Sequence, residues 1–102
     1  MTEGKWSEPE LIDYDSHKSE EGWQQMLKTD GHVWFHVRGK YYFVFPESRP
    51  YRFGMCYGED ELTGNFARWK FKNADELLSS PIFDGKTIKE LLPEIRGWEP
   101  GC

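Results

Sequence analysis

The stretch HVWFHVRGKYYFVFP, residues 32–46, decides the fold of this chain of 102 residues. Two runs with a period of two lie on either side of the pair Gly39-Lys40, and this is the pattern of a β-hairpin. Because glycine suits the first central position of a type II′ turn, we place the turn at Gly39-Lys40. Directly opposed side chains share a sheet face, so this turn predicts that Arg38 faces Tyr41 across the hairpin.

The predicted hairpin has two faces of different chemistry. The first face is apolar and comprises Val33, Phe35, Val37, Tyr42 and Val44. The second face mixes aromatic rings with histidine and arginine, and comprises His32, Trp34, His36, Arg38, Tyr41, Phe43 and Phe45. We expect the first face to lie in the core, and the second either to lie beneath a helix as another hydrophobic layer or to form a contact surface.

Two further strands are predicted after the hairpin, separated by an acidic, glycine-containing turn over 58–65. A strand over 51–57 places Arg52 and Cys56 on the same side. In a strand over 66–72 the core-facing residues are Ala67, Trp69 and Phe71, and the outward-facing residues are Phe66, Arg68, Lys70 and Lys72. Four strands joined by short loops imply an antiparallel meander.

Capping signals predict short helices on both sides of the strands. Ser19 is a suitable N-cap and Gly31 a suitable stop, so a helix is predicted between them. Before it, residues 1–15 form an arm or an edge strand. After the strands, capping patterns start helices at Asn73 and at Thr87.

The last predicted helix contains a proline, Pro93. Its ring and its missing N–H break a helix, so we expect a kink near Leu92 and a further turn that ends at Gly97. The whole chain, residues 1–102, is then a single α+β domain. Its antiparallel sheet has four or five strands and is flanked by two or three short helices.

Charge is unevenly distributed along the chain, whose formal net charge is −5. Residues 1–30 carry three basic and eight acidic groups, and residues 73–102 carry three basic and six acidic groups. Residues 31–72 between them carry seven basic and four acidic groups. The basic middle segment either complements the acidic helices of the same chain or meets a negatively charged partner. The longest apolar run, 41–45, is far shorter than the roughly 20 residues of a membrane-spanning helix, so we expect no membrane association.

Candidate residues for chemistry are few. His32 and His36 lie four apart on a strand, about 13 Å from each other, so they cannot share a metal ion, and we expect no metal and no cofactor. Cys56 and Cys102 are too few for a disulfide framework and are interpreted as free thiols of a cytoplasmic protein. Cys56 is a candidate nucleophile only if a base lies within reach.

The leading functional hypothesis is a non-enzymatic module that binds a protein partner or a second copy of itself. It rests on the aromatic residues, because 12 of the 17 in the chain lie between residues 31 and 72. The candidate binding surface comprises Trp34, His36, Arg38, Tyr41, Phe43, Phe45, Arg52, Arg68 and Lys70. One alternative is single-stranded nucleic acid bound on the same surface, and another is a small enzyme that uses Cys56. The segment 81–91 resembles segments of small bacterial proteins, and the overall type resembles immunity proteins, antitoxins and mobile-element accessory proteins.

Overall fold

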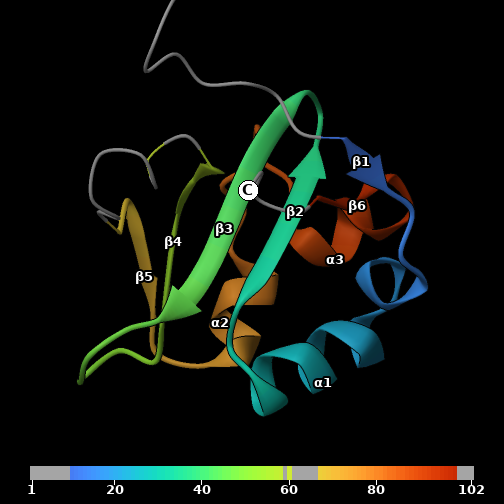
Figure 1. Cartoon of the computed structure of the whole chain (residues 1–102). Helices are drawn as coiled ribbons and strands as arrows, with labels where there is room; N and C mark the ends of the chain where they lie inside the picture. Colours follow the sequence, from blue (N-terminus) through green and yellow to red (C-terminus); the bar gives the residue numbers. More distant parts are fainter. Residues whose placement is uncertain (1–9, 59, 61–66, 99–102) are drawn as a thin grey trace, which may run out of the picture.

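The computed structural model describes residues 10–58, 60 and 67–98. It confirms the α+β class, because one antiparallel sheet is flanked by short helices (Figure 1). The elements follow in the order β1 (Leu11–Ile12), the 3-10 helix η1 (Asp15–Lys18), α1 (Glu20–Thr29), β2 (Val33–Val37), β3 (Lys40–Pro46), β4 (Phe53–Tyr57), β5 (Trp69–Phe71), α2 (Ala74–Ser79), α3 (Ile88–Leu91), the 3-10 helix η3 (Leu92–Glu94) and β6 (Arg96–Trp98).

The sheet has six strands in the order β1-β6-β2-β3-β4-β5. The predicted meander is present as β2 to β5, and the N-terminal segment joins as the edge strand β1. Strand β6 was not predicted, and the helical turn expected to end at Gly97 is wrong. Pro93 lies within the single 3-10 turn η3, and the chain is extended again from Ile95. Gly97 then pairs with Ile12 on one side and Phe35 on the other.

The hairpin turn lies one residue earlier than predicted. Its two central residues are Arg38 and Gly39, with φ values of 54° and 81°, which is the type I′ pattern. His36 therefore faces Tyr41, and the predicted pairing of Arg38 with Tyr41 is wrong. The error moves every pairing by two residues, so the strand residues keep their predicted faces. Arg38 is the exception: it is a turn residue beyond the paired strands, so its predicted place on the second face is wrong.

The helix caps follow the predicted signals. The Ser19 hydroxyl oxygen accepts the N–H of Gly22 at 3.0 Å and starts α1. Asn73 caps α2 by accepting the N–H of Glu76 at 2.8 Å. Thr87 and Glu90 form a reciprocal capping box on α3. These bonds satisfy N–H groups that the first turn of a helix leaves without partners.

The hydrophobic core lies on the first face of the sheet. All five predicted members of that face are buried. The helix residues packed on them are Trp23 and Leu27 of α1, Leu77 and Leu78 of α2, and Ile88 and Leu91 of α3. Every buried apolar side chain of these three helices belongs to this one core, so none of the three covers the second face (Figure 1).

The outer strands are shorter than predicted. Trp69 and Phe71 of β5 face the core as expected. Ala67 does not face the core as predicted but lies on the second face. Its Cβ is 3.1 Å from where a Cβ on Gly54 would be, and Gly54 shares the second face with Phe45 and Lys70. The predicted turn over 58–65 falls mostly outside the described residues, as does Phe66.

Candidate functional site

The second sheet face carries most of the predicted candidate residues, and we call it the aromatic face. Its members are His32, Trp34, His36, Tyr41, Phe43, Phe45 and Trp98. Directly opposed positions on β2 and β3 bring Trp34 next to Phe43 and His36 next to Tyr41. Trp98 of β6 is the member that sequence reasoning missed.

A compact stack of rings lies at the centre of the aromatic face. The rings of Trp34 and Phe43 are 4.8 Å apart and tilted by 12°, and the His32 ring lies 6.2 Å from Trp34 and 5.9 Å from Phe43. Phe45 extends the group, 5.3 Å from Phe43. Since Trp34 and Phe43 stack on each other, one face of each ring is already covered.

Trp98 closes one side of this group. Its ring meets Tyr41 at 5.5 Å and 84° and Trp34 at 6.5 Å and 76°, and its Nε1–H donates to the carbonyl oxygen of Phe35 at 3.0 Å. The ring lies close to Gly58, where an added Cβ would be 2.8 Å from Trp98 Cζ2. Glycine at position 58 therefore allows Trp98 to lie against the backbone just after β4.

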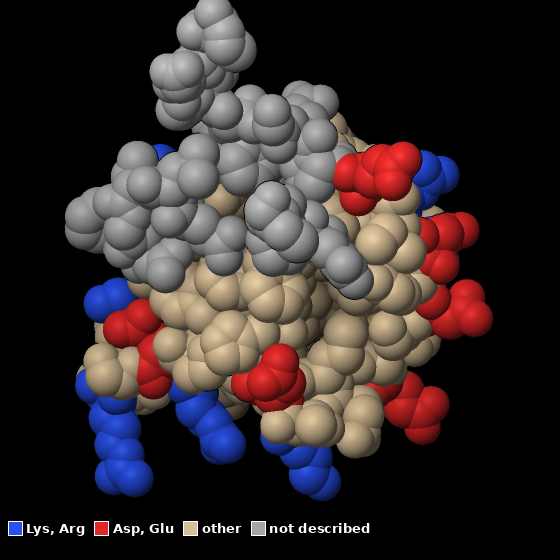
Figure 2. Space-filling model, viewed as in Figure 1, with Lys and Arg blue, Asp and Glu red and all other residues tan. Residues whose placement is uncertain are grey.

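Exposure divides the aromatic face into an anchored part and an accessible part. Phe43 is 5% exposed and Trp98 is 1% exposed. Trp34, His36, Tyr41 and Phe45 are half-buried. In Figure 2, which has the viewpoint of Figure 1, uncharged side chains occupy most of the lower middle of this side. Basic groups lie along the lower rim, and acidic groups lie on the right, at the lower left and at one place in the lower middle.

The predicted basic residues are not a free cationic surface. Arg38 Nε lies 3.3 Å from Glu94 Oε1, and Lys70 Nζ lies 4.0 Å from Glu47 Oε2. Arg68 forms a two-pronged bond with Asp60, with N–O distances of 2.6 and 3.1 Å. This bond lowers the pKa of the Asp60 carboxyl and raises that of the Arg68 guanidinium.

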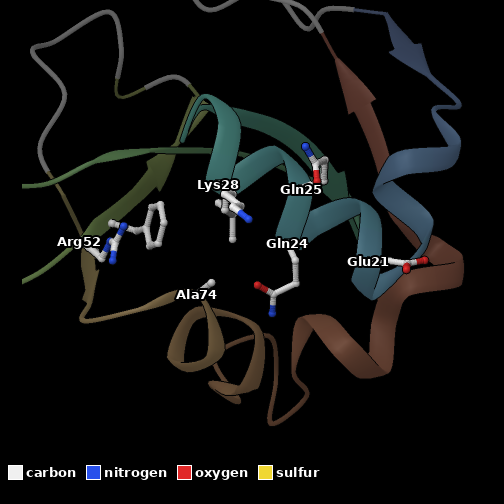
Figure 3. A pocket seen from close by; sticks show the side chains of 8 residues that line it. Glu21, Gln24, Gln25, Lys28, Arg52 and Ala74 are labelled. Atoms are coloured by element: carbon white, nitrogen blue, oxygen red, sulfur yellow. The ribbon is translucent and has the colours of Figure 1, made fainter.

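The structure does not bring Arg52 to the aromatic face. Arg52 lines a cleft of about 410 Å³ on the helical side of the molecule, together with Gln24 and Lys28 of α1 and Ala74 of α2 (Figure 3). Arg52 precedes β4, and its N–H donates to the carbonyl oxygen of Phe71 at 2.8 Å. The alternation of the strand therefore does not extend to this residue.

The buried histidine of η1 was not singled out from the sequence. His17 is 6% exposed, and its Nε2 lies 3.1 Å from the carbonyl oxygen of Trp34. A carbonyl only accepts, so Nε2 carries the hydrogen and the neutral ring has Nδ1 as its acceptor. Burial lowers the pKa of His17, and the bond to Trp34 opposes that effect. His17 therefore acts as a neutral tie between η1 and β2.

The arrangement around Cys56 offers little to an enzyme. Cys56 lies opposite Phe43 in the sheet and has no exposed surface, whereas a nucleophilic thiolate must be reached by its substrate. Within residues 10–58, 60 and 67–98, no group of three histidine, cysteine or acidic side chains is arranged to hold a metal ion. None of the helices in those ranges has the length and apolar character needed to cross a bilayer.

Comparison of the chain with models of known protein families, with curated proteins and with solved structures found no match.

Proposed function

We propose that this chain is a small non-enzymatic interaction module that binds a protein partner, or a second copy of itself, on its aromatic face. One observation carries the proposal. The helices α1, α2 and α3 all pack on the first face of the sheet, while β2 and β3 carry half-buried aromatic rings on the second. Clustered apolar side chains of this kind mark contact surfaces on soluble proteins.

The ring geometry supports a protein partner rather than single-stranded nucleic acid. Bases bind by stacking on open ring faces, but Trp34 and Phe43 already cover one face of each other. Phosphates require available cations, but Arg38, Arg68 and Lys70 lie next to acidic side chains. Ring edges and apolar surface suit protein side chains better.

The proposed setting is the cytoplasm, where the buried thiol of Cys56 stays reduced. We also propose that the chain belongs among small bacterial cytosolic or mobile-element proteins. This part of the proposal is supported only by the general resemblance of its sequence to proteins of that type.

The test compares the wild-type chain with Trp34→Ala and with Lys86→Ala, whose side chain is exposed outside the aromatic face. Each immobilised chain captures proteins from a lysate, and any captured protein is then purified and titrated against the three chains. Light scattering over a concentration series tests self-association of the same chains. We expect the wild type and Lys86→Ala to bind alike and Trp34→Ala to bind about tenfold or more weakly, as for a central aromatic contact.

Equal binding by folded Trp34→Ala would overturn the proposal, as would monomeric behaviour combined with no specific capture. Two further measurements address the alternatives. Affinity for single-stranded oligonucleotides that falls steeply with salt and with Lys70→Glu would indicate nucleic acid instead. Rapid thiol modification of Cys56 in the folded chain would favour the enzyme.

A further inference from the structure

A notch opens at the edge of the aromatic face where β6 ends. Strand β6 pairs with β2 only at Phe35 and His36, so the start of β2 extends beyond it. The space beside that start is a cavity of about 380 Å³, which we call the notch. Its walls come from η1, α1, β2 and β6 and include Tyr14, His17, Met26, His32, Trp34 and Trp98.

The notch is chemically suited to a large apolar side chain. Three of its walls are aromatic rings, and Trp34 and Trp98 meet at 76°, so they form a corner. Met26 adds a thioether, which adapts to differently shaped neighbours. A second hollow of about 330 Å³ shares two lining residues, Met26 and His32, with the notch. Each volume lies within the range of roughly 300–1,000 Å³ found for ligand pockets.

The surroundings of the notch are acidic. Asp30 lines the adjoining hollow, with its Oδ1 3.6 Å from His32 Nδ1, and Asp13 and Asp15 are the sequence neighbours of the wall residue Tyr14. Lys18 offsets Asp13 through an ion pair of 2.9 Å, whereas the described walls of both hollows contain no lysine or arginine.

We infer that the notch binds a large apolar side chain from a segment of a partner protein whose neighbouring residues are basic. Burial of the apolar side chain provides affinity, and the acidic surroundings orient the basic neighbours. The net charge of −5 makes a second copy of this chain a poor occupant. The inference rests on the proposed function, to which it adds the chemistry of the partner and the point of contact.

The experiment titrates the full-length, nitrogen-15-labelled chain with three capped pentapeptides at low salt. The first has phenylalanine at its centre and two lysines on each side. The second replaces the lysines by glutamates, and the third replaces the phenylalanine by alanine. NMR chemical shifts of Met26, His32 and Trp34 report occupancy of the notch.

We expect the first peptide to bind in roughly the millimolar range, because a single side chain provides most of the affinity. The glutamate peptide should bind about threefold or more weakly through repulsion at the acidic surroundings. The alanine peptide should bind about tenfold or more weakly because it lacks the apolar group. Equal binding of the three peptides, or shifts confined to residues outside the notch, would overturn the inference.

Two variants with matched controls sharpen the result. Met26→Lys places a long cationic side chain in the notch, and Gln24→Lys makes a similar change on the opposite side of α1, where Gln24 lines the other cleft. Asp30→Asn removes one exposed acid from the surroundings, and Asp75→Asn removes an exposed acid from α2. Only Met26→Lys and Asp30→Asn should weaken the first peptide, Asp30→Asn by about two- to fivefold.

Failure of this inference is distinguishable from failure of the proposed function. If no peptide reaches the notch while Trp34→Ala still abolishes partner binding, the notch assignment is wrong and the aromatic face stands. If Trp34→Ala leaves partner binding intact, the proposed function itself is wrong.

Discussion

Replacing Trp98 by alanine tests whether the short strand β6 anchors the aromatic face. The Trp98 side chain is 1% exposed. Its ring contacts Tyr41 and Trp34 at right-angle geometry, and its Nε1–H supplies a hydrogen bond to the carbonyl oxygen of Phe35. Trp98→Ala removes all three interactions and leaves a space that the close backbone of Gly58 does not fill.

The expected loss in the free energy of unfolding is about 3–5 kcal/mol, the range for truncation of a buried large aromatic residue. A domain of this size has a total stability of roughly 5–15 kcal/mol, so the variant should retain little of it. Trp98→Phe keeps a ring but loses the donor to Phe35. Leaving a buried carbonyl without this partner costs about 1–3 kcal/mol, so this variant should be intermediate.

Urea unfolding followed by far-ultraviolet circular dichroism measures these losses, because the chain has five tryptophans and fluorescence would not isolate one of them. Arg96→Ala is the control on the same strand, since Arg96 is exposed and should change stability by less than about 0.5 kcal/mol. A loss below about 1 kcal/mol for Trp98→Ala would refute the reasoning, because it would mean that β6 contributes little to holding the rings.

Three further predictions concern the pH dependence, the hairpin turn and a helix cap. Burial lowers the pKa of His17 in the folded chain, so on acidification the unfolded chain takes up this proton first. The free energy of unfolding should therefore fall as the pH drops below about 6.5. The difference between the urea midpoints at pH 7.5 and pH 5.5 should be smaller in His17→Gln than in the wild type. Gly39 has a φ of 81°, and Gly39→Ala should cost about 1 kcal/mol in a urea titration, whereas an unchanged midpoint would argue against the type I′ turn. Thr87→Ala removes the acceptor for the N–H of Glu90 and should cost about 0.5–2 kcal/mol, with Thr87→Ser close to the wild type as its control.

Local patterns in the sequence predict much of this fold and part of the candidate site. The alternation over residues 32–46 assigns each strand side chain of the hairpin to its face, and this assignment survives the misplaced turn because a shift of two residues preserves the alternation. Ser19, Asn73 and Thr87 start their helices where expected, since a cap depends only on residues two or three positions away.

The site was predicted less completely than the strands that carry it. Trp34, His36, Tyr41, Phe43 and Phe45 lie together because adjacent strands bring them together. Arg52 was misplaced because the alternation of β4 begins only at Phe53. The cations at positions 38, 68 and 70 looked available in the sequence, but their acidic neighbours are visible only after the loops and η3 are in place.

The sequence by itself determined the antiparallel hairpin, its two chemically different faces and the starts of the helices, because these depend on spacing between near neighbours. Tertiary structure alone decided that the helices all pack on the first face and that Arg96–Trp98 forms a strand between β1 and β2. A strand of three residues is too short to show a period. Its stabilising contacts, such as the bond from Trp98 to Phe35, join residues 63 positions apart, and no local pattern records them.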